Sequence, residues 1–217
     1  MGQPVPDLHW DKLSLFRREV PKEILKLPVV YSTLLEELVN HIPSDVRVLD
    51  VGANDRSLGR TLAQGGFRGT YRSMDISPET QQDYYSLEDI HETFEVIVLK
   101  EVIEHLPLAQ FLTYLRKVSS LLVPGGKLLL TTPNVYSVVH WESWDITHIQ
   151  HYPYQDLYAL LRMEGFQVKL TRIAAKVFYV SPGLPLRVLK HVYRQWHVRS
   201  FPQTDFAGSL FVEAVKG

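Results

Sequence analysis

Residues 47–60 read R-V-L-D-V-G-A-N-D-R-S-L-G-R, and this stretch decides the fold. Residues 46–51 form a short run of mainly β-branched apolar side chains, which predicts a buried strand. Residues 52–55 predict a tight turn, because Gly and Asn tolerate a positive φ. Ser57 is the expected N-cap of a short helix over residues 58–64. A strand, a glycine-bearing turn and a helix are typical of the start of a nucleotide-binding βαβ unit.

Two acidic residues follow the apolar parts of the first two expected strands. Asp50 lies at the end of the first strand, where it can meet a cationic or hydroxyl-bearing ligand group. Residues 71–74 predict a second short strand, and Asp75 follows it, 23 positions after Gly52. An acidic residue about 20 positions after the glycine turn commonly binds a ribose diol. We therefore expect ribose binding at Asp75, and the alternative is that its carboxylate only caps the turn at Ser77.

The rest of the chain alternates between helical and strand-like patterns. Residues 13–20 and 24–27, interrupted at Pro21, and residues 34–42 carry apolar side chains at helical spacing, and Ser32 is a candidate cap for the last of these segments. The later elements are expected as strands over residues 94–99, 127–132, 166–173 and 208–215, and as helices over residues 107–122 and 154–164.

Four segments together resemble the class I S-adenosylmethionine-dependent methyltransferases, in particular those with type-11, type-12 and type-23 methyltransferase domains. They are V-L-D-V-G-A-N-D, M-D-I-S, F-E-V-I-V-L-K-E-V-I-E-H-L and L-L-V-P-G-G-K-L-L-L-T-T-P-N, and the resemblance covers about residues 46–166. The resemblance implies an α/β, doubly wound, Rossmann-like sheet of seven strands with one antiparallel strand. N-terminal helices and a helical insertion before the last strand complete the expected fold. Residues 1–45 would form an N-terminal helical cap, and residues 46–217 the methyltransferase domain of a single globular unit.

The resemblance also implies S-adenosylmethionine as the cofactor and a methyltransferase activity. The methionine moiety would lie near Asp50 and Gly52, the ribose at Asp75, and one wall of the site at Lys100 and Glu101. Asp89 is the candidate for the adenine amine, and the alternative is a solvated loop residue. The expected cofactor-binding residues are Asp50, Gly52, Ala53, Asn54, Asp75, Ile76, Asp89, Lys100 and Glu101.

The stretch 135–154 is rich in aromatic residues and histidines, which is typical of a substrate loop at the edge of an α/β sheet. Methyl transfer to a hydroxyl needs a base, and neutral imidazole titrates near pH 7. His148 and His151 are the candidates, in a T-H-x-x-H pattern that resembles the same family. We expect a small-molecule or lipid-like acceptor, methylated at oxygen.

A basic stretch separates the last two expected strands. No acidic residue occurs between Glu164 and Asp205, and residues 185–198 predict an amphipathic helix with one basic face and one apolar face. Such a helix suits an anionic membrane surface. The alternative is a helix that docks over the active site with its basic face in solvent.

Two further functions remain open on the sequence alone. Glu101, Glu104, His105 and His148 resemble the E-x-x-E-H…H pattern of metal-dependent small-RNA 2′-O-methyltransferases, in which a divalent ion orients ribose hydroxyls. The family also usually has glycine where this chain has Asn54 and Arg56, which would suit a non-catalytic binding or scaffold protein.

Composition limits the remaining classes. The 217 residues contain no cysteine, which excludes disulfides and Cys-ligated metals, and the formal net charge of −1 argues against a nucleic-acid partner. No apolar run is long enough to span a membrane, and the N-terminal residues do not resemble a signal peptide. We expect a cytoplasmic protein, with the membrane surface as its one candidate attachment; the oligomeric state is left open.

Overall fold

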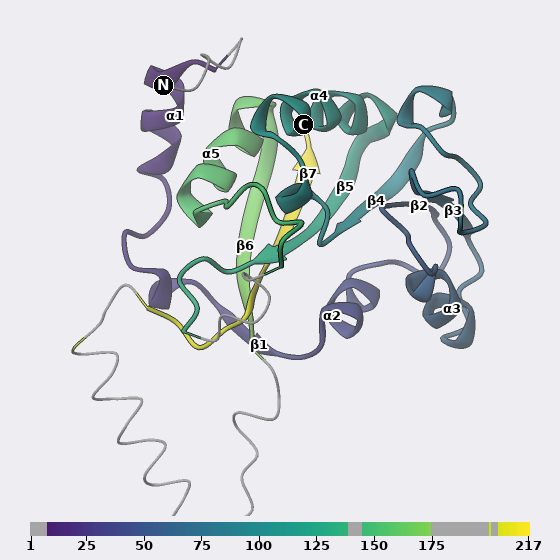
Figure 1. Ribbon diagram of the computed structural model, residues 1–217, viewed down its shortest axis with the longest axis horizontal. Coiled ribbons are helices and arrows are strands. Elements are labelled where there is room, and N and C mark those ends of the chain that lie inside the picture. Colours follow the sequence, from purple (N-terminus) through teal and green to yellow (C-terminus); the bar gives the residue numbers. More distant parts are fainter. Residues whose placement is uncertain (1–7, 139–144, 175–199, 201–203) are drawn as a thin grey trace, which may run out of the picture.

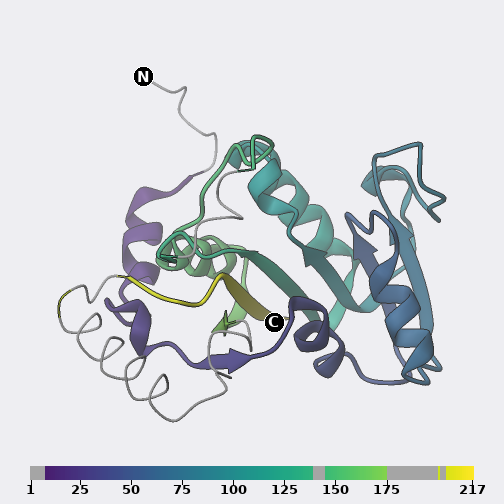
Figure 2. The same ribbon diagram turned by 60° about the horizontal axis from the view of Figure 1, so that its bottom comes forward.

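A single sheet of seven strands runs through the computed structural model, which describes residues 8–138, 145–174, 200 and 204–217. The strand order is β1-β6-β7-β5-β4-β2-β3, and helices lie on both sides of the sheet (Figures 1 and 2). The strands are β1 (Val29–Tyr31), β2 (Arg47–Val51), β3 (Thr70–Met74), β4 (Phe94–Lys100), β5 (Leu122–Pro133), β6 (Phe166–Ala174) and β7 (Ser209–Lys216). The helices are α1 (Trp10–Arg17), α2 (Leu34–Asn40), α3 (Ser57–Gln64), α4 (Leu108–Leu121) and α5 (Tyr154–Met163), with short 3-10 turns η1 (Ile24–Lys26), η2 (Leu87–Asp89) and η3 (Ile103–His105).

The strand directions confirm the predicted doubly wound α/β fold. Neighbouring strands among β2, β3, β4 and β5 pair in parallel, whereas β7 pairs antiparallel with both β5 and β6. The carboxyl ends of β2, β3, β4 and β5 therefore meet at one edge of the sheet, where open α/β sheets bind their ligands.

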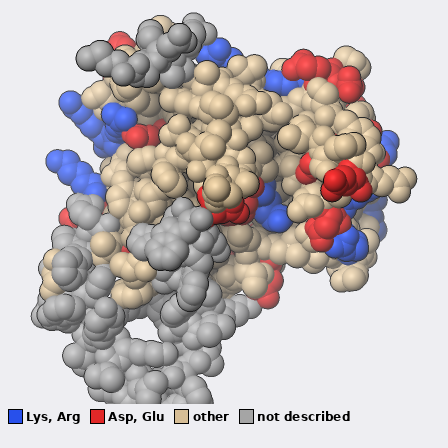
Figure 3. Space-filling view, in the orientation of Figure 1, with Lys and Arg blue, Asp and Glu red and all other residues tan. Residues whose placement is uncertain are grey.

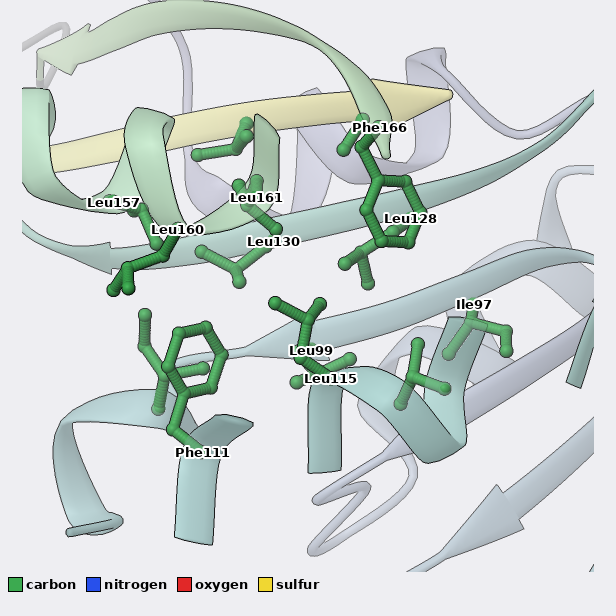
Figure 4. Close-up of a cluster of buried hydrophobic side chains, with 14 of the residues drawn as sticks. Ile97, Leu99, Phe111, Leu115, Leu128, Leu130, Leu157, Leu160, Leu161 and Phe166 are labelled. Atoms are coloured by element: carbon green, nitrogen blue, oxygen red, sulfur yellow. The ribbon is translucent and has the colours of Figure 1, made fainter. Parts of the chain in front are cut away.

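Two apolar cores cover the two faces of the sheet. On one face, α4 and α5 pack through side chains such as Phe111 and Leu157 against Leu99 and Leu130 of the sheet (Figure 4). On the other face, α2 and α3 contribute a smaller cluster that includes the fully buried Leu58. Successive strand residues alternate between the two cores, so β4 reads as a nearly continuous apolar run.

The N-terminal residues differ from the expected all-helical cap. Residues 29–31 form β1, which pairs in parallel with β6 from Arg172 to Ala174 at the edge of the sheet. Beyond β3, a single parallel bridge joins Met74 to Tyr84. The division of the chain at residue 45 stays a prediction.

Two helix caps also differ from the expected residues. Thr33, not Ser32, caps α2: its Oγ1 accepts from the Glu36 backbone N–H at 3.1 Å, and the Glu36 carboxylate accepts from the Thr33 N–H at 2.9 Å. Ser57 is already the first residue of α3, and its N–H donates to Asp55 Oδ1 at 3.0 Å. The side chain of Asp55 thus accepts a hydrogen bond from the first backbone N–H of α3, two residues downstream of it.

The expected basic helix over residues 185–198 lies outside the described residues. Within the described part of the chain, no helix is both long and apolar enough to cross a membrane.

A buried ion pair joins three parts of the chain at the end of β6. The Arg172 guanidinium donates to Asp205 Oδ1 at 2.8 Å and to the backbone carbonyls of Leu25 and Leu27. Both charged side chains are about 95% buried, at 5% and 4% exposure. Asp205 also accepts from Asn134 Nδ2 at 3.1 Å, just beyond β5. The pair therefore connects the N-terminal segment to the ligand-binding edge of the sheet.

We predict that Arg172→Met destabilises the fold by about 3–5 kcal/mol, because it leaves Asp205 buried without its guanidinium partner. The matched control is Arg116→Met, which removes a partly exposed ion pair to Glu164 and should change the free energy of unfolding by less than about 1 kcal/mol. Urea unfolding followed by circular dichroism gives both values. Equal small losses in the two variants would contradict the buried pair.

Candidate active site

The turn after β2 has the backbone geometry that the sequence predicts. Gly52 has φ +75°, and a Cβ atom at this position would lie 2.5 Å from Val102 Cγ2. Glycine is thus required twice, for the left-handed backbone and for the close approach of the segment after β4. Asn54 and Arg56 also have positive φ, at 45° and 59°. Asn tolerates this conformation, whereas Arg adopts it at some energetic cost.

Asp75 joins the end of β3 to this turn. Its Oδ2 accepts from the Asn54 backbone N–H at 2.8 Å, and its Oδ1 accepts from the Ser77 N–H at 2.9 Å. The carboxylate therefore does cap the following turn, and it also faces the glycine turn. An ionised carboxylate offers about four acceptor positions, so capacity for hydroxyl donors remains. The next residue, Ile76, exposes 75% of its surface and gives this edge an apolar face.

Asp50 is the buried acid of the site. It is 1% exposed, and its Oδ2 accepts from the Tyr71 hydroxyl at 2.7 Å. Its Oδ1 is buried and accepts no hydrogen bond from any described residue. Burial raises the pKa of Asp50 to about 6, although the Tyr71 hydrogen bond and the charge of Lys100 oppose the rise. A buried carboxylate with an unused oxygen favours a ligand that brings a cationic donor.

Arg56 does not project freely from the turn. Its guanidinium donates to the Gln81 carbonyl and to Asp83 Oδ2, both at 3.3 Å. It also lies over the ring of Tyr71, 5.6 Å from the centroid. These contacts hold the charged group beside β3.

The other predicted cofactor residues lie at or near the same edge. Lys100 ends β4, and Glu101 follows it with φ 53° and an N–H that donates to Thr131 Oγ1. Ala53 is buried in the turn, and its N–H donates to the Met74 carbonyl. Asp89 is exposed at the end of η2, and its adenine contact stays a prediction.

A second cluster lies beyond the end of β4. One ligand-type atom from each of Glu104, His105 and His148 lies within 4.8 Å of the other two. The rings of His105 and His148 meet edge to face, with 4.8 Å between centroids. Backbone N–H groups of Ile149 and Gln150 donate to the Glu104 carbonyl at 2.9 and 3.0 Å, which fixes the His148 loop on η3.

Glu104 is the buried member of this cluster. It is 2% exposed, and its Oε2 accepts from Thr132 Oγ1 at 3.1 Å. Burial raises the pKa of Glu104, and hydrogen bonds, among them those from its own backbone and from Thr132, oppose the rise only in part. The cluster can therefore hold a proton or a cation.

The structure separates the two predicted catalytic histidines. His148 belongs to the cluster, whereas His151 is exposed and takes no part in it. Tyr71 and Thr132 were not foreseen as site residues. Their contacts depend on strand register and on loop docking, for which the chain carries no local motif.

Comparison with known proteins identifies the family. A family model described as "Methyltransferase domain", of type 23, matches residues 20–170. The chain belongs to the class I methyltransferases. The predicted family is thus confirmed. The crystal structure of a SAM-dependent methyltransferase from Archaeoglobus fulgidus has the same fold, with a TM-score of 0.66, 15% identity, and coverage of 84% of this chain and 91% of that one.

Two curated relatives add a more specific likeness. Human "Ubiquinone biosynthesis O-methyltransferase, mitochondrial" is 28% identical over 149 residues, covering 58% of this chain and 40% of the relative. "Ubiquinone biosynthesis O-methyltransferase" of Xanthomonas axonopodis pv. citri is 33% identical over 111 residues, covering 42% and 45%. The chain therefore spans less than half the length of these relatives.

The residues at the carboxyl ends of β2 and β3 fit S-adenosylmethionine, the cofactor of this family. Asp75 retains acceptor capacity for a ribose diol, and Asp50 Oδ1 is an unused acceptor for an ammonium group. The exposed Ile76 offers an apolar surface for a base.

We predict that Asp50→Asn stabilises the free protein at neutral pH. The Asp50 pKa is 3.8 unfolded and about 6 folded, so the wild type loses about 3 kcal/mol of stability as pH rises from about 4 to 7. The Asn variant lacks this loss. Urea unfolding of both proteins at the two pH values measures the difference, and parallel curves would contradict the buried acid.

The control for this measurement has the opposite sign. Arg47 lowers the pKa of Glu95 through a side-chain hydrogen bond, so the stability from that carboxylate is present at neutral pH and lost as pH falls. Glu95→Gln should therefore destabilise the protein at neutral pH and converge with the wild type in acid.

Proposed function

We propose that the chain transfers a methyl group from S-adenosylmethionine to a hydroxyl oxygen of a small, lipid-like acceptor. The observation that carries the proposal is the position of His148, which is held against Glu104 and His105 beside the edge that holds Asp50, Gly52 and Asp75. The two relatives named as ubiquinone biosynthesis O-methyltransferases support an oxygen nucleophile on a lipid-like molecule.

Methyl transfer requires no covalent bond between the protein and its substrates. The cofactor supplies an electrophilic methyl group and its own leaving group, so the protein mainly orients the acceptor and excludes water. As the oxygen–carbon bond forms and the sulfur–carbon bond breaks, the hydroxyl proton must leave. We assign this proton to His148, whose imidazole is half-buried beside Glu104. The buried carboxyl stabilises the imidazolium that results.

Apolar side chains beside His148 support the lipid-like class. Ile146 and Ile149 expose 95% and 59% of their surfaces on the loop that presents His148. The backbone of this loop is fixed on η3, so the two side chains face outward from a defined position. An acceptor with an apolar tail would cover them while its hydroxyl reaches the imidazole.

A second candidate is a metal-assisted reaction at the same cluster. Carboxylate and imidazole ligands within 4.8 Å of one another suit a divalent ion that would bind the acceptor hydroxyl and lower its pKa. Figure 3 argues for a small acceptor over RNA in either case. On the face shown, described acidic and basic side chains are interspersed, with an acidic and a basic patch side by side near the middle, and they form no continuous basic belt.

A membrane contact through residues 185–198 and a cytoplasmic location are predictions; the human relative is named as mitochondrial.

We predict that Asp75→Ala and Gly52→Ala each raise the Kd for S-adenosylhomocysteine at least about tenfold. The first change removes a ribose acceptor and the partner of the Asn54 N–H, and the second places a methyl group 2.5 Å from Val102 Cγ2. Isothermal titration calorimetry measures the affinity. Gly66→Ala is the matched control, because Gly66 has a similar φ of +79° but no atom within 4 Å of the added Cβ. Unchanged affinity in both test variants would overturn the site.

We predict that His148→Ala lowers methyl transfer about 10²–10⁴-fold while leaving the affinity for S-adenosylhomocysteine unchanged. The assay follows a labelled methyl group from S-adenosylmethionine to a prenylated catechol in detergent micelles. His151→Ala, at an exposed position outside the cluster, is the comparison and should lose far less. Equal losses would remove the special role of His148.

The metal alternative has its own readout. Titration of the protein with Mg²⁺ or Zn²⁺ alone should give no heat if His148 acts as a base without metal. A binding heat that Glu104→Gln abolishes would favour the metal-assisted reaction instead.

A further inference from the structure

Tyr71 contacts three residues next to the proposed cofactor site: Asp50, Gly59 and Arg56. It is the second residue of β3, and its hydroxyl donates to Asp50 Oδ2 on the neighbouring strand at 2.7 Å. The proposed contact between Asp50 and the cofactor does not by itself explain why the ring is held from two further sides, by α3 and by Arg56.

The first of these contacts involves a glycine inside a helix. Gly59 is the third residue of α3, and an added Cβ atom would lie 2.6 Å from Cε1 and 2.7 Å from Cζ of Tyr71. Glycine within a helix is less favourable than alanine by about 1 kcal/mol. Only glycine leaves room for the ring in its observed orientation.

The second contact comes from the turn itself. The left-handed backbone of Arg56 places its guanidinium 5.6 Å from the Tyr71 centroid, where a cation is attracted to the ring face. Asp83 holds the guanidinium from behind at 3.3 Å, and it also accepts from the backbone N–H and hydroxyl of Ser73 at 2.8 and 2.9 Å. The ring is thus enclosed between α3 and a fixed cation.

We propose that Tyr71 is a positioning residue: it fixes Asp50 Oδ2, so that Oδ1 is the oxygen that receives the ammonium group of the cofactor, while Gly59 and Arg56 hold its ring. The proposal rests on the proposed function, because it takes S-adenosylmethionine as the ligand. It also accounts for the bulky residue in the glycine turn, since the Arg56 side chain stabilises the site from behind β3.

The charges around Asp50 give the network a second effect. Burial, Asp55 and Asp75 raise the Asp50 pKa, whereas the Tyr71 hydroxyl and Lys100 lower it. Burial also raises the pKa of Tyr71, and the charge of Asp50 adds to the rise, so the hydroxyl stays a donor at every working pH. Without this hydroxyl the Asp50 pKa would be higher. More of the carboxyl would then be protonated at neutral pH, and its attraction for the ammonium group of the ligand would weaken.

The test compares two ligands on three variants of the full chain. S-adenosylhomocysteine carries the ammonium group, whereas 5′-methylthioadenosine shares the adenosine and lacks the amino acid part. Tyr71→Phe removes only the hydroxyl, and Gly59→Ala displaces the ring while improving helix propensity. Tyr158→Phe is the control. Tyr158 lies on the distant helix α5, and the change removes another hydrogen bond from a tyrosine hydroxyl to a carboxylate, that of Glu19. Calorimetry from about pH 5.5 to 8.5 spans the titration of Asp50.

We expect Tyr71→Phe to bind S-adenosylhomocysteine about tenfold more weakly at pH 7 and to recover part of the affinity at the alkaline end. Its affinity for 5′-methylthioadenosine should not change. Gly59→Ala should behave in the same way, and Tyr158→Phe should match the wild type.

Each other outcome has a separate meaning. Equal losses for both ligands, or an unchanged pH profile in Tyr71→Phe, would overturn the positioning role. If the wild-type protein bound neither ligand, the proposed function itself would fail, independently of Tyr71.

Discussion

One buried guanidinium constrains how the segments before β1 and before β7 pack against the sheet. Arg172 enters the interior from β6, and its charge is tolerable there only because Asp205 and two backbone carbonyls surround it. Those partners come from the segment before β1 and from the segment before β7, so both must be in place before the charge is satisfied. Asn134, which follows β5 at the ligand edge, shares Asp205 with Arg172. The position of Asn134 therefore depends on the same ion pair that joins the N-terminal residues to the sheet.

The described non-glycine residues with a strained backbone lie at the edge of the sheet formed by the carboxyl ends of the parallel strands. Asn54, Arg56 and Glu101 are the described non-glycine residues with positive φ, and all three follow β2 or β4 within five positions. Such conformations persist only where surrounding contacts impose them. Asp75 holds the Asn54 N–H, Asp83 holds the Arg56 guanidinium, and Thr131 holds the Glu101 N–H. The positive φ angles turn the backbone sharply just after β2 and after β4. The turn after β2 and the segment after β4 thus come together beside Gly52 and Val102.

Local patterns predicted those parts of the fold that depend on local physics. β2, its glycine turn and Asp75 follow from apolar periodicity and from the spacing of a βαβ unit, and the structure places them as expected. The three-residue β1 carries too short a pattern to be distinguished, and it is a strand only because β6 lies beside it. The meeting of Glu104 with His148 depends on backbone hydrogen bonds across about 45 positions of chain, from Ile149 and Gln150 to the Glu104 carbonyl. No periodicity encodes such a contact, so the sequence could offer the residues of the cluster but not their proximity.

Asp50 shows how the fold and the ligand share one electrostatic problem. The carboxylate must be ionised to attract a cation, yet it must be buried for the attraction to be strong, and burial disfavours its charge. The Tyr71 hydroxyl satisfies one oxygen and leaves the other for the ligand. The free protein therefore holds a charge that its own side chains stabilise only in part, and a cationic ligand supplies the missing interaction. Because such a ligand binds the folded state alone, cofactor binding and folding stability must rise together. A change that strengthens the hydrogen bond from Tyr71 to Asp50 should favour the ionised carboxylate, and should therefore raise both the affinity for a cationic ligand and the stability of the folded chain.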